Sequence, residues 1–492
     1  MSELPGSISD ENAPILRVLS DAQLRRFHDA ALELLQDPGI QVTTEEGRKL
    51  LLDAGCSPAG EDIVRIPAQL VEDALASAPE TFALYDRNGD ERALLGEGRA
   101  YFGTGVTALK YEDPDSGEVH NFTLADFAEV ARLTDALENL DFIASPGVVR
   151  PSADLPLSTV NQCEFLEMTA NTVKPVMPLV ADGAALADIF EMAAIVAGGR
   201  EELRQRPFVT PYLNSVSPLV FNPETLDKLL LSADWGIPVC CQPGPTLGAT
   251  GPVTVGGTTA LSAAETLAAL VISQVRREGA PFIAGAVPMS LDMRTGELGG
   301  GGMESMLAAL ASSELARFWH LPQVGSGASS DSKLADEQAA AEVSAYILCD
   351  ILSGVDLAFD AGGIEMGLSH SAHLMVLVDE VVAMFRTMLR GVPTDDENLA
   401  LDTIRSVGPG GQYLGTQHTL KHFREMRVST LMDSGSRLDW RESGSKTLRD
   451  RMRERALDLI GSHEPERLPD DMVTGMQAVI DERRRASAVG GA

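Results

Sequence analysis

Eight short apolar runs, spaced roughly 30 to 45 residues apart, are the feature that most constrains the fold of this 492-residue chain. The stretches between them mostly carry helical patterns, as in "NPETLDKLLLSADWG" at residues 222–236. Strands that are apolar throughout, rather than alternately polar and apolar, and that alternate with helices along the chain are typical of a parallel sheet buried on both faces. Eight such units predict a (β/α)8 TIM-type barrel, with a doubly wound sheet as the alternative. The runs begin near residues 101, 142, 175, 208, 237, 281, 321 and 357.

The segments before and after these runs have a different character. Residues 20–39 predict an amphipathic helix that begins after Ser20, and Asn88-Gly89 predicts the turn of a β-hairpin. After residue 390 the helical patterns become strongly charged, as in "SKTLRDRMRERALDLIGSH". We therefore expect an N-terminal helical and hairpin cap over residues 1–100, the barrel over 101–390, and a helical C-terminal extension over 391–492.

The chain is strongly acidic, with a formal net charge of −33 at pH 7. Such a surface repels phosphate backbones, so nucleic acid is not an expected partner. No apolar run reaches the roughly 20 residues of a membrane span, and the first residues lack the regions of a signal peptide. The five cysteines, an odd number without CxxC spacing, indicate a reducing compartment. Together these features predict a cytoplasmic protein that binds neither nucleic acid nor membrane.

Polar residues follow the last two apolar runs. If the barrel forms, residues just after each strand lie at the end where barrel enzymes have their active sites. The seventh run is followed by "SGASSDSKLADEQAAAE", in which hydroxyls and charges come directly after a buried strand. Asp331 in this stretch has an alternative role as the N-cap of the next helix. Glu365, after the eighth run, has an alternative role as an acid at a helix N-terminus.

Two histidine pairs have spacings that zinc sites also use. His418 and His422 are four residues apart, and His370 and His373 are three apart. Neither pair has an evident third ligand and no HExxH motif occurs, so we expect no metal. A metal-dependent lyase or hydrolase that uses His418, His422 and Glu365 remains an alternative. No loop fits a P-loop or a nucleophile elbow.

Six long blocks occur in order along the chain: "GTGVTALKYEDPDSGEV", "NSVSPLVFNPETLDKLL", "WGIPVCCQPGPTLGATGPVT", "SDSKLADEQAAAE", "AGGIEMGL" and "GPGGQYLGTQHTL". Together they resemble the trimethylamine methyltransferase family. The resemblance implies a (β/α)8 barrel that moves a methyl group from a methylated amine to the reduced cobalt of a corrinoid. It also implies that a separate small carrier protein brings the corrinoid to the barrel mouth, so the chain itself holds no cofactor tightly.

One departure from the family bears on the substrate. Members that act on trimethylamine carry pyrrolysine in the segment that resembles "GASSDSK", where this chain has only ordinary residues. The departure indicates the branch without pyrrolysine, whose members demethylate glycine betaine and related quaternary amines. A quaternary ammonium has no N–H to donate, so its site should offer aromatic faces and nearby carboxylates.

From this resemblance we expect residues near the strand ends to act in catalysis or in substrate binding. If the substrate is a betaine, some of them should donate hydrogen bonds to its carboxylate. The candidates for catalysis are Ser329, Ser330, Asp331 and Glu365, and those for substrate binding are Tyr101, Phe102, Tyr212, Asn214, Gln242, Lys333, Phe359 and His418. Each aromatic candidate has core packing as its alternative. A barrel that binds a betaine without turnover is a second functional alternative, and a homo-oligomer is compatible with all of them.

Overall fold

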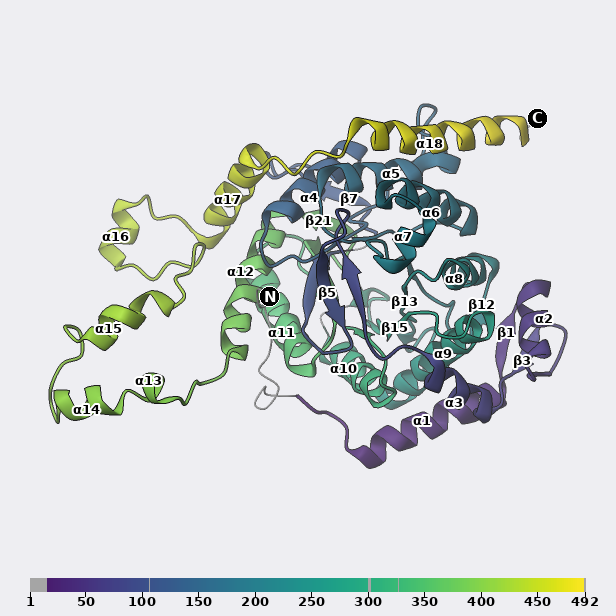
Figure 1. Ribbon diagram of the computed structural model, residues 1–492, viewed down its shortest axis with the longest axis horizontal. Coiled ribbons are helices and arrows are strands. Elements are labelled where there is room, and N and C mark those ends of the chain that lie inside the picture. The colour runs from purple at the N-terminus through teal and green to yellow at the C-terminus, as the bar shows by residue number, and fades with distance from the viewer. Residues whose placement is uncertain (1–15, 106, 300–301, 326, 491–492) are drawn as a thin grey trace.

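Eight parallel strands form a closed barrel in the computed structural model of this chain, which describes residues 16–105, 107–299, 302–325 and 327–490 (Figure 1). Six of them make one sheet in the order β11-β13-β15-β18-β19-β6. Parallel bridges from Gly103 to Phe142 and from Leu179 to Tyr212, with the pairing of β9 and β10, close the ring. The expected (β/α)8 barrel is confirmed. Its strands are β6 (Tyr101–Thr104), β9 (Ile143–Ala144), β10 (Val176–Met177), β11 (Tyr212–Leu213), β13 (Val239–Cys241), β15 (Phe282–Gly285), β18 (Gln323–Val324) and β19 (Leu357–Ala361).

A helix follows each strand and packs on the outside of the barrel (Figure 1). The local sequence explains where they start and stop. In α8, for example, the Asn222 side chain accepts the N–H of Thr225, Pro223 occupies the first turn, and Gly236 ends the helix in a left-handed conformation. The eight helices are α4 (Leu124–Ala136), α5 (Leu157–Asn171), α6 (Gly183–Ala197), α8 (Pro223–Trp235), α9 (Val255–Arg276), α10 (Met303–Phe318), α11 (Glu337–Ser353) and α12 (Ala372–Leu389), with the short α7 (Arg200–Gln205) after α6.

The helix α9 corrects one expectation from the sequence. By length and composition this helix is apolar enough to cross a membrane, whereas the sequence was expected to contain no apolar run of that length. However, 78% of its apolar window is buried inside the protein. It is therefore a core helix of the barrel wall.

A hairpin closes the amino-terminal end of the barrel. Its strands are β4 (Phe82–Tyr85) and β5 (Glu91–Leu95), and the turn falls at Asn88-Gly89 as expected. Leu84 and Leu95 belong to the same buried cluster as the side chains that fill the barrel interior. Access to the interior is thus left to the opposite end, at the carboxyl ends of the strands.

The rest of the N-terminal segment packs on the barrel wall. Ser20 and Gln23 form a capping box at the start of α1, as the sequence predicts for Ser20. Its apolar face and that of α3 share one core with α8, α9 and α10. A strand pairing, Gln41 with Val220, also joins this segment to the loop after β11. The elements are α1 (Asp21–Gln36), β1 (Ile40–Val42), α2 (Glu45–Asp53), β2 (Ser57–Pro58), β3 (Ile63–Arg65), α3 (Ala68–Ser77) and, in the loop, β12 (Val220–Phe221).

After α12 the chain leaves the barrel and then returns to it. Figure 1 shows α13 to α16 lying away from the barrel, and α17 and α18 lying along it. Apolar side chains of α17 and α18, among them Met452 and Met476, join the core that the barrel helices form. The division into three units at residues 100 and 390 stays a prediction. The elements are α13 (Asp396–Leu399), α14 (Leu401–Val407), α15 (Gln417–His422), the 3₁₀ turn η1 (Phe423–Glu425), α16 (Arg437–Glu442), α17 (Leu448–Ser462) and α18 (Asp470–Gly490).

The loops at the carboxyl end of the barrel contain short additional strands. They form one sheet in the order β14-β16-β17 and another in the order β20-β21-β7-β8. Both sheets come from segments that follow barrel strands, so they build up the rim of the mouth. The strands are β7 (Lys110–Glu112), β8 (Val119–Asn121), β14 (Thr246–Leu247), β16 (Met289–Leu291), β17 (Leu298–Gly299), β20 (Gly363–Ile364) and β21 (Ser369–Ser371).

Candidate active site

The carboxyl end of β19 carries a carboxylate, Asp360, in a left-handed backbone conformation with φ +69°. Glycines follow the two neighbouring strands beside it. A Cβ atom built on Gly105 would lie 3.1 Å from its Oδ1, and one built on Gly327 would lie 3.3 Å from its Oδ2. The missing side chains therefore make room for this carboxylate at the mouth.

Further residues around Asp360 also adopt left-handed conformations. Thr107, Glu365 and Met366 have φ values of +68°, +54° and +62°. Each such residue costs about 1–3 kcal/mol, and in proteins these conformations gather at functional sites. The concentration of strain where the first and last strands meet marks this side of the mouth as the candidate site.

Two aromatic rings stand inside the barrel beside this carboxylate. Tyr212 and Phe359 meet edge to face, with ring centroids 5.6 Å apart, and both belong to the cluster that fills the interior. Burial raises the pKa of the Tyr212 hydroxyl well above its usual value, and the Cys240 thiol and the Asp360 carboxylate add to this effect. Tyr212 therefore stays protonated at neutral pH and its ring lies within electrostatic range of Asp360.

Gln242, directly after β13, contributes an acceptor. It is fully buried, and its Nε2 donates a hydrogen bond of 3.0 Å to the carbonyl of Gly325. Its Oε1 has no partner among the described residues. Buried acceptors in proteins nearly always have a partner, so this atom is available to a bound molecule or a water. Cys240 and Cys241 beside it face opposite sides of the strand, as expected, because they belong to different core clusters.

The segment around Ser330 is held firmly by its neighbours. The Ser330 hydroxyl donates to Glu342 of α11 at 2.6 Å, and the backbone N–H of Asp331 donates to the same carboxylate at 2.9 Å. The backbone of Ser330 also bonds to Gly363 at 2.9 Å, and Ser332 accepts the N–H of Glu365 at 2.7 Å. The structure thus brings the segment after β18 alongside the segment after β19.

Two alternatives for the acids in these segments are wrong. The N-cap of α11 is Asp336, whose side chain accepts the N–H groups of Gln338 and Ala339, and not Asp331. Glu365 lies in the turn between β20 and β21, where it accepts the Ser369 hydroxyl at 2.7 Å, and not at a helix N-terminus. Both carboxylates are partly exposed at the rim.

The other candidates occupy the rim or lie elsewhere. Ser329 packs against β20, 3.0 Å from a Cβ built on Gly363. Lys333 is exposed and donates to the carbonyl of Asp331 at 2.9 Å, and Asn214 is exposed after β11. These positions are compatible with contact to a substrate at the mouth, and the roles stay predictions.

Three candidates are not at the mouth, which corrects their expected positions. Tyr101 begins its strand and so lies at the closed end, where its hydroxyl accepts the N–H of Leu94 at 3.2 Å. Phe102 faces out of the barrel into the core formed with the helices. His418 lies on α15, outside the barrel, with its Nε2 3.2 Å from the carbonyl of Glu397.

The histidine pairs show no metal geometry. His418 and His422 do share a helical face, with ring centroids 4.4 Å apart. His370 lies against the sulfur of Met375, and burial lowers the pKa of its imidazole to about 3, whereas His373 bonds to the carbonyl of Pro114. Among the residues that the structure describes, no group of three or more His, Cys, Asp or Glu side chains is placed to hold a metal ion.

A buried acid below the rim was not anticipated from the sequence. Glu164 on α5 accepts the N–H of Val149 and the side-chain N–H of Asn161, each at 2.9 Å. It thereby fixes the loop after β9 at the mouth. Burial raises the pKa of this carboxyl to about 7, against the opposing effect of the two hydrogen bonds.

Replacing Glu164 with Gln is expected to make stability less dependent on pH. The folded-state pKa of about 7 lies above the unfolded value of 4.5, so the contribution of this group to stability is full below pH 4.5 and is lost as pH rises through 7. The shift corresponds to at most about 3 kcal/mol. Urea unfolding at pH 5 and pH 8 should show the difference between the two pH values shrinking in Glu164→Gln. The exposed Glu278→Gln serves as control, and an unchanged pH slope in Glu164→Gln would contradict the assignment.

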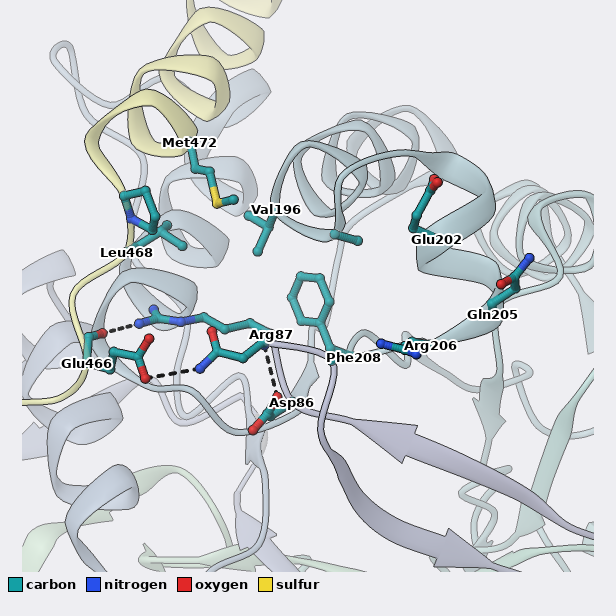
Figure 2. A pocket seen from close by; sticks show the side chains of 14 residues that line it. Asp86, Arg87, Val196, Glu202, Gln205, Arg206, Phe208, Glu466, Leu468 and Met472 are labelled. Atoms are coloured by element: carbon teal, nitrogen blue, oxygen red, sulfur yellow. Dashed lines mark hydrogen bonds between the residues drawn. The ribbon is translucent and has the colours of Figure 1, made fainter.

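A pocket of about 540 Å³ lies at the other end of the barrel (Figure 2). The turn of the β4–β5 hairpin, the end of α6 and the segment before α18 enclose it. Arg87 in its wall donates to the backbone carbonyls of Thr169 and Glu466, and Phe208 and Met472 form an apolar side. It is separated from Asp360 by the packed barrel interior, so it is not part of the candidate active site.

Comparison with known proteins agrees with this geometry. The sequence model of the family described as Trimethylamine methyltransferase (MTTB) matches residues 5–488. The chain is 31% identical over 468 residues to a trimethylamine methyltransferase of Desulfitobacterium hafniense, covering 94% of this chain and 93% of that one. It is 29% identical to a glycine betaine methyltransferase of the same species, covering 96% and 98%.

A solved structure gives the same fold at much lower sequence similarity. The monomethylamine methyltransferase of Methanosarcina barkeri aligns with a TM-score of 0.54 at 13% identity, over 96% of this chain and 88% of that one. The family match, by contrast, spans nearly the whole sequence. The chain therefore belongs to the trimethylamine methyltransferase family, a family of methyltransferases.

Proposed function

We propose that this methyltransferase takes a methyl group from a quaternary amine, glycine betaine or a close relative, and transfers it to the Co(I) corrinoid of a separate carrier protein. The observation that carries the choice of amine is the Tyr212–Phe359 ring pair, which lies inside the barrel next to the Asp360 carboxylate. Aromatic faces and a carboxylate are the groups that hold a cation without N–H donors. The identities of 31% and 29% to the two Desulfitobacterium hafniense enzymes do not separate their substrates. The ordinary residues at 327–333, where the family resemblance places pyrrolysine, favour the quaternary amine.

The reaction needs orientation more than acid or base catalysis. The Co(I) centre of the docked corrinoid supplies the nucleophile. As the methyl carbon is attacked, the C–N bonding pair stays with nitrogen, and a neutral tertiary amine departs without gaining a proton. A carboxylate stabilises the cationic substrate more than a transition state whose ammonium charge is fading, so Asp360 acts in binding and alignment.

The rim of the mouth supports a protein partner at this end. Exposed large apolar side chains occur in the loops or helix starts after seven of the eight strands, and a solvated rim rarely carries so many unless it binds something. A docked carrier would bring its corrinoid directly over the open end of the barrel. The side chains are Leu109, Val119, Leu157, Val216, Val253, Met293, Leu298, Met303, Leu307, Leu334 and Leu368.

The test is a substrate panel in the presence of Co(I) corrinoid. Glycine betaine, proline betaine, carnitine and choline should be compared with trimethylamine, with loss of the Co(I) absorbance as the readout. We expect at least one quaternary amine to react and trimethylamine to be inert. Reaction with trimethylamine alone would overturn the substrate choice. Tight binding of a betaine by calorimetry, with the corrinoid unchanged, would favour a binding protein instead.

A further inference from the structure

The pocket of about 540 Å³ at the closed end of the barrel, which we call the basal pocket, is formed by three segments that are far apart in the sequence (Figure 2). They are the hairpin turn at 86–89, the end of α6 with α7 and the residues after it at 196–208, and residues 466–472, which lead into α18. The volume falls within the range of roughly 300–1,000 Å³ that small-molecule sites have. The packed barrel interior lies between this pocket and the mouth, so the proposed methyl transfer does not use it.

One wall of the basal pocket holds a buried guanidinium. Arg87 is 6% exposed, and its side chain has no ion pair with a carboxylate among the described residues; it donates instead to the backbone carbonyls of Thr169 and Glu466. These bonds use two of the five N–H groups that an arginine has. Burial lowers the pKa of Arg87 more than the surrounding carboxylates raise it. The charge of Arg87 is thus only partly compensated by the protein, which favours an anion beside it.

A second guanidinium lies on the opposite side of the basal pocket from Glu466 (Figure 2). It belongs to Arg206, directly after α7, whose side chain has neither a hydrogen bond nor an ion pair with any residue in the described part of the chain. A Cβ atom built on Gly89 would lie 3.4 Å from its Nη1, so this guanidinium rests on the hairpin turn, two residues from Arg87. The planar fork of N–H groups on an arginine matches a carboxylate, so Arg206 is free to hold one.

The acids around the basal pocket are engaged elsewhere. Asp86 is buried and accepts two backbone N–H groups of the hairpin turn, at 2.9 and 3.0 Å, and the Nε–H of Arg92 at 3.0 Å. Glu466 accepts the side-chain N–H of Asn88 at 3.1 Å, and the carboxylate of Glu202 turns back over the first turn of α7. Because Glu202 and Glu466 are still near, a ligand with one negative charge fits this pocket better than a phosphate with nearly two.

The rest of the lining is apolar. Phe208, Val196 and Leu468 are buried, and Met472 is half-buried. Figure 2 shows the Phe208 ring and the Met472 side chain on the same side of Arg87. An apolar wall beside two guanidinium groups suits a molecule with a charged head and an apolar body.

We infer that the basal pocket binds a small organic monocarboxylate, whose carboxylate pairs with Arg206 in the field of Arg87 and whose apolar body lies against Phe208 and Met472. The same two guanidinium groups repel a cationic amine, so this site is distinct from the one proposed for the methyl donor. Since its walls come from three segments, a bound carboxylate fastens residues 466–472 to the hairpin turn and to the end of α6. The site therefore couples a small acid to the docking of the C-terminal helix.

Calorimetric titration of the full chain tests the site, with octanoate, acetate and 1-octanol as probes. We expect saturable binding of octanoate, and much weaker binding of acetate, which lacks the apolar body, and of 1-octanol, which lacks the charge. Arg206→Gln should weaken octanoate binding by about tenfold, as loss of a charged hydrogen-bond partner does. Arg204→Gln is the matched control, because Arg204 is on α7 but pairs with Glu201 and does not line the pocket.

Three results of the titration would overturn the inference. They are no saturation by octanoate up to about 5 mM, equal affinity for octanoate in the natural chain and in Arg206→Gln, and 1-octanol binding as tightly as octanoate. Arg206 is exposed, so its replacement does not threaten the fold.

Amide hydrogen exchange locates the bound probe without any substitution. Saturating octanoate should slow exchange at residues 86–89 and in the first turn of α18, and leave the loops of the barrel mouth unchanged. Slower exchange at the mouth or on α13 to α16, with no change at 86–89 and in α18, would assign the probe to another apolar surface and refute the site. Neither measurement depends on methyl transfer, so failure here is distinct from failure of the proposed function.

Discussion

Replacing Asp360 with Asn is expected to raise the KM for the amine substrate by roughly 30- to 100-fold and to change kcat much less. A unit charge about 5 Å from a cation, at an effective dielectric constant near 20, contributes about 3 kcal/mol, which is the upper bound on the loss. Asn tolerates the left-handed conformation that residue 360 adopts, so the change removes the charge and keeps the backbone. Steady-state methyl transfer over a range of amine concentrations measures both constants.

The sequence offers Asp331 and Glu365 as the carboxylate for the cation, and the same assay separates Asp331 from Asp360. The Oδ2 of Asp331 lies 3.7 Å from a Cβ built on Gly299 of β17, so it faces the rim sheet. Asp331→Asn should therefore change KM less than about threefold, which is within the usual effect of a surface change. A larger effect of Asp331→Asn than of Asp360→Asn would mean that Asp331, a candidate from the sequence, holds the cation, and would contradict the role proposed for Asp360.

The eight strands could be predicted because parallel strands are apolar on both faces. Each apolar run therefore stands out between helical patterns, even where the paired part is as short as β9 or β10. The positions of side chains within a strand were harder to predict. Tyr101 and Phe102 stand at the start of their strand, so one lies at the closed end and the other faces the helices. Chain direction within a parallel barrel makes only the last residues of a run and those after it available to the mouth.

Asp360 was missed for a related reason. It lies inside the run "LAFDAGG", whose apolar character predicts a buried strand, so the sequence favours Glu365 beyond the run as the carboxylate. A charged residue near the carboxyl end of an apolar run was the available signal. Its left-handed backbone and the two facing glycines depend on three different strands, so local sequence did not reveal them.

Glu265 left a clearer signal, since it is the lone charge in the long apolar stretch of α9. Its carboxylate accepts hydrogen bonds from the hydroxyls of Ser215 and Ser217, at 3.0 and 2.7 Å, and from the N–H of Leu219 at 2.7 Å. Burial raises the pKa of this group, and the three hydrogen bonds oppose the rise. An acid on a core helix thus holds the loop that follows Tyr212.

Replacing Glu265 with Ala is expected to lower the free energy of unfolding by about 3–5 kcal/mol, because it leaves the buried Ser215 hydroxyl and the partly buried Ser217 hydroxyl and Leu219 N–H without their partner. This is a large part of the 5–15 kcal/mol that a typical domain has. Glu265→Gln keeps the shape and an acceptor for Leu219, so its cost should be only about 1–2 kcal/mol. Urea unfolding measures both, and amide exchange at Leu219 should rise in the Ala variant before global unfolding. A loss below about 1 kcal/mol in the Ala variant would mean that water replaces the carboxylate and that the loop is positioned by its pairing with β1 instead.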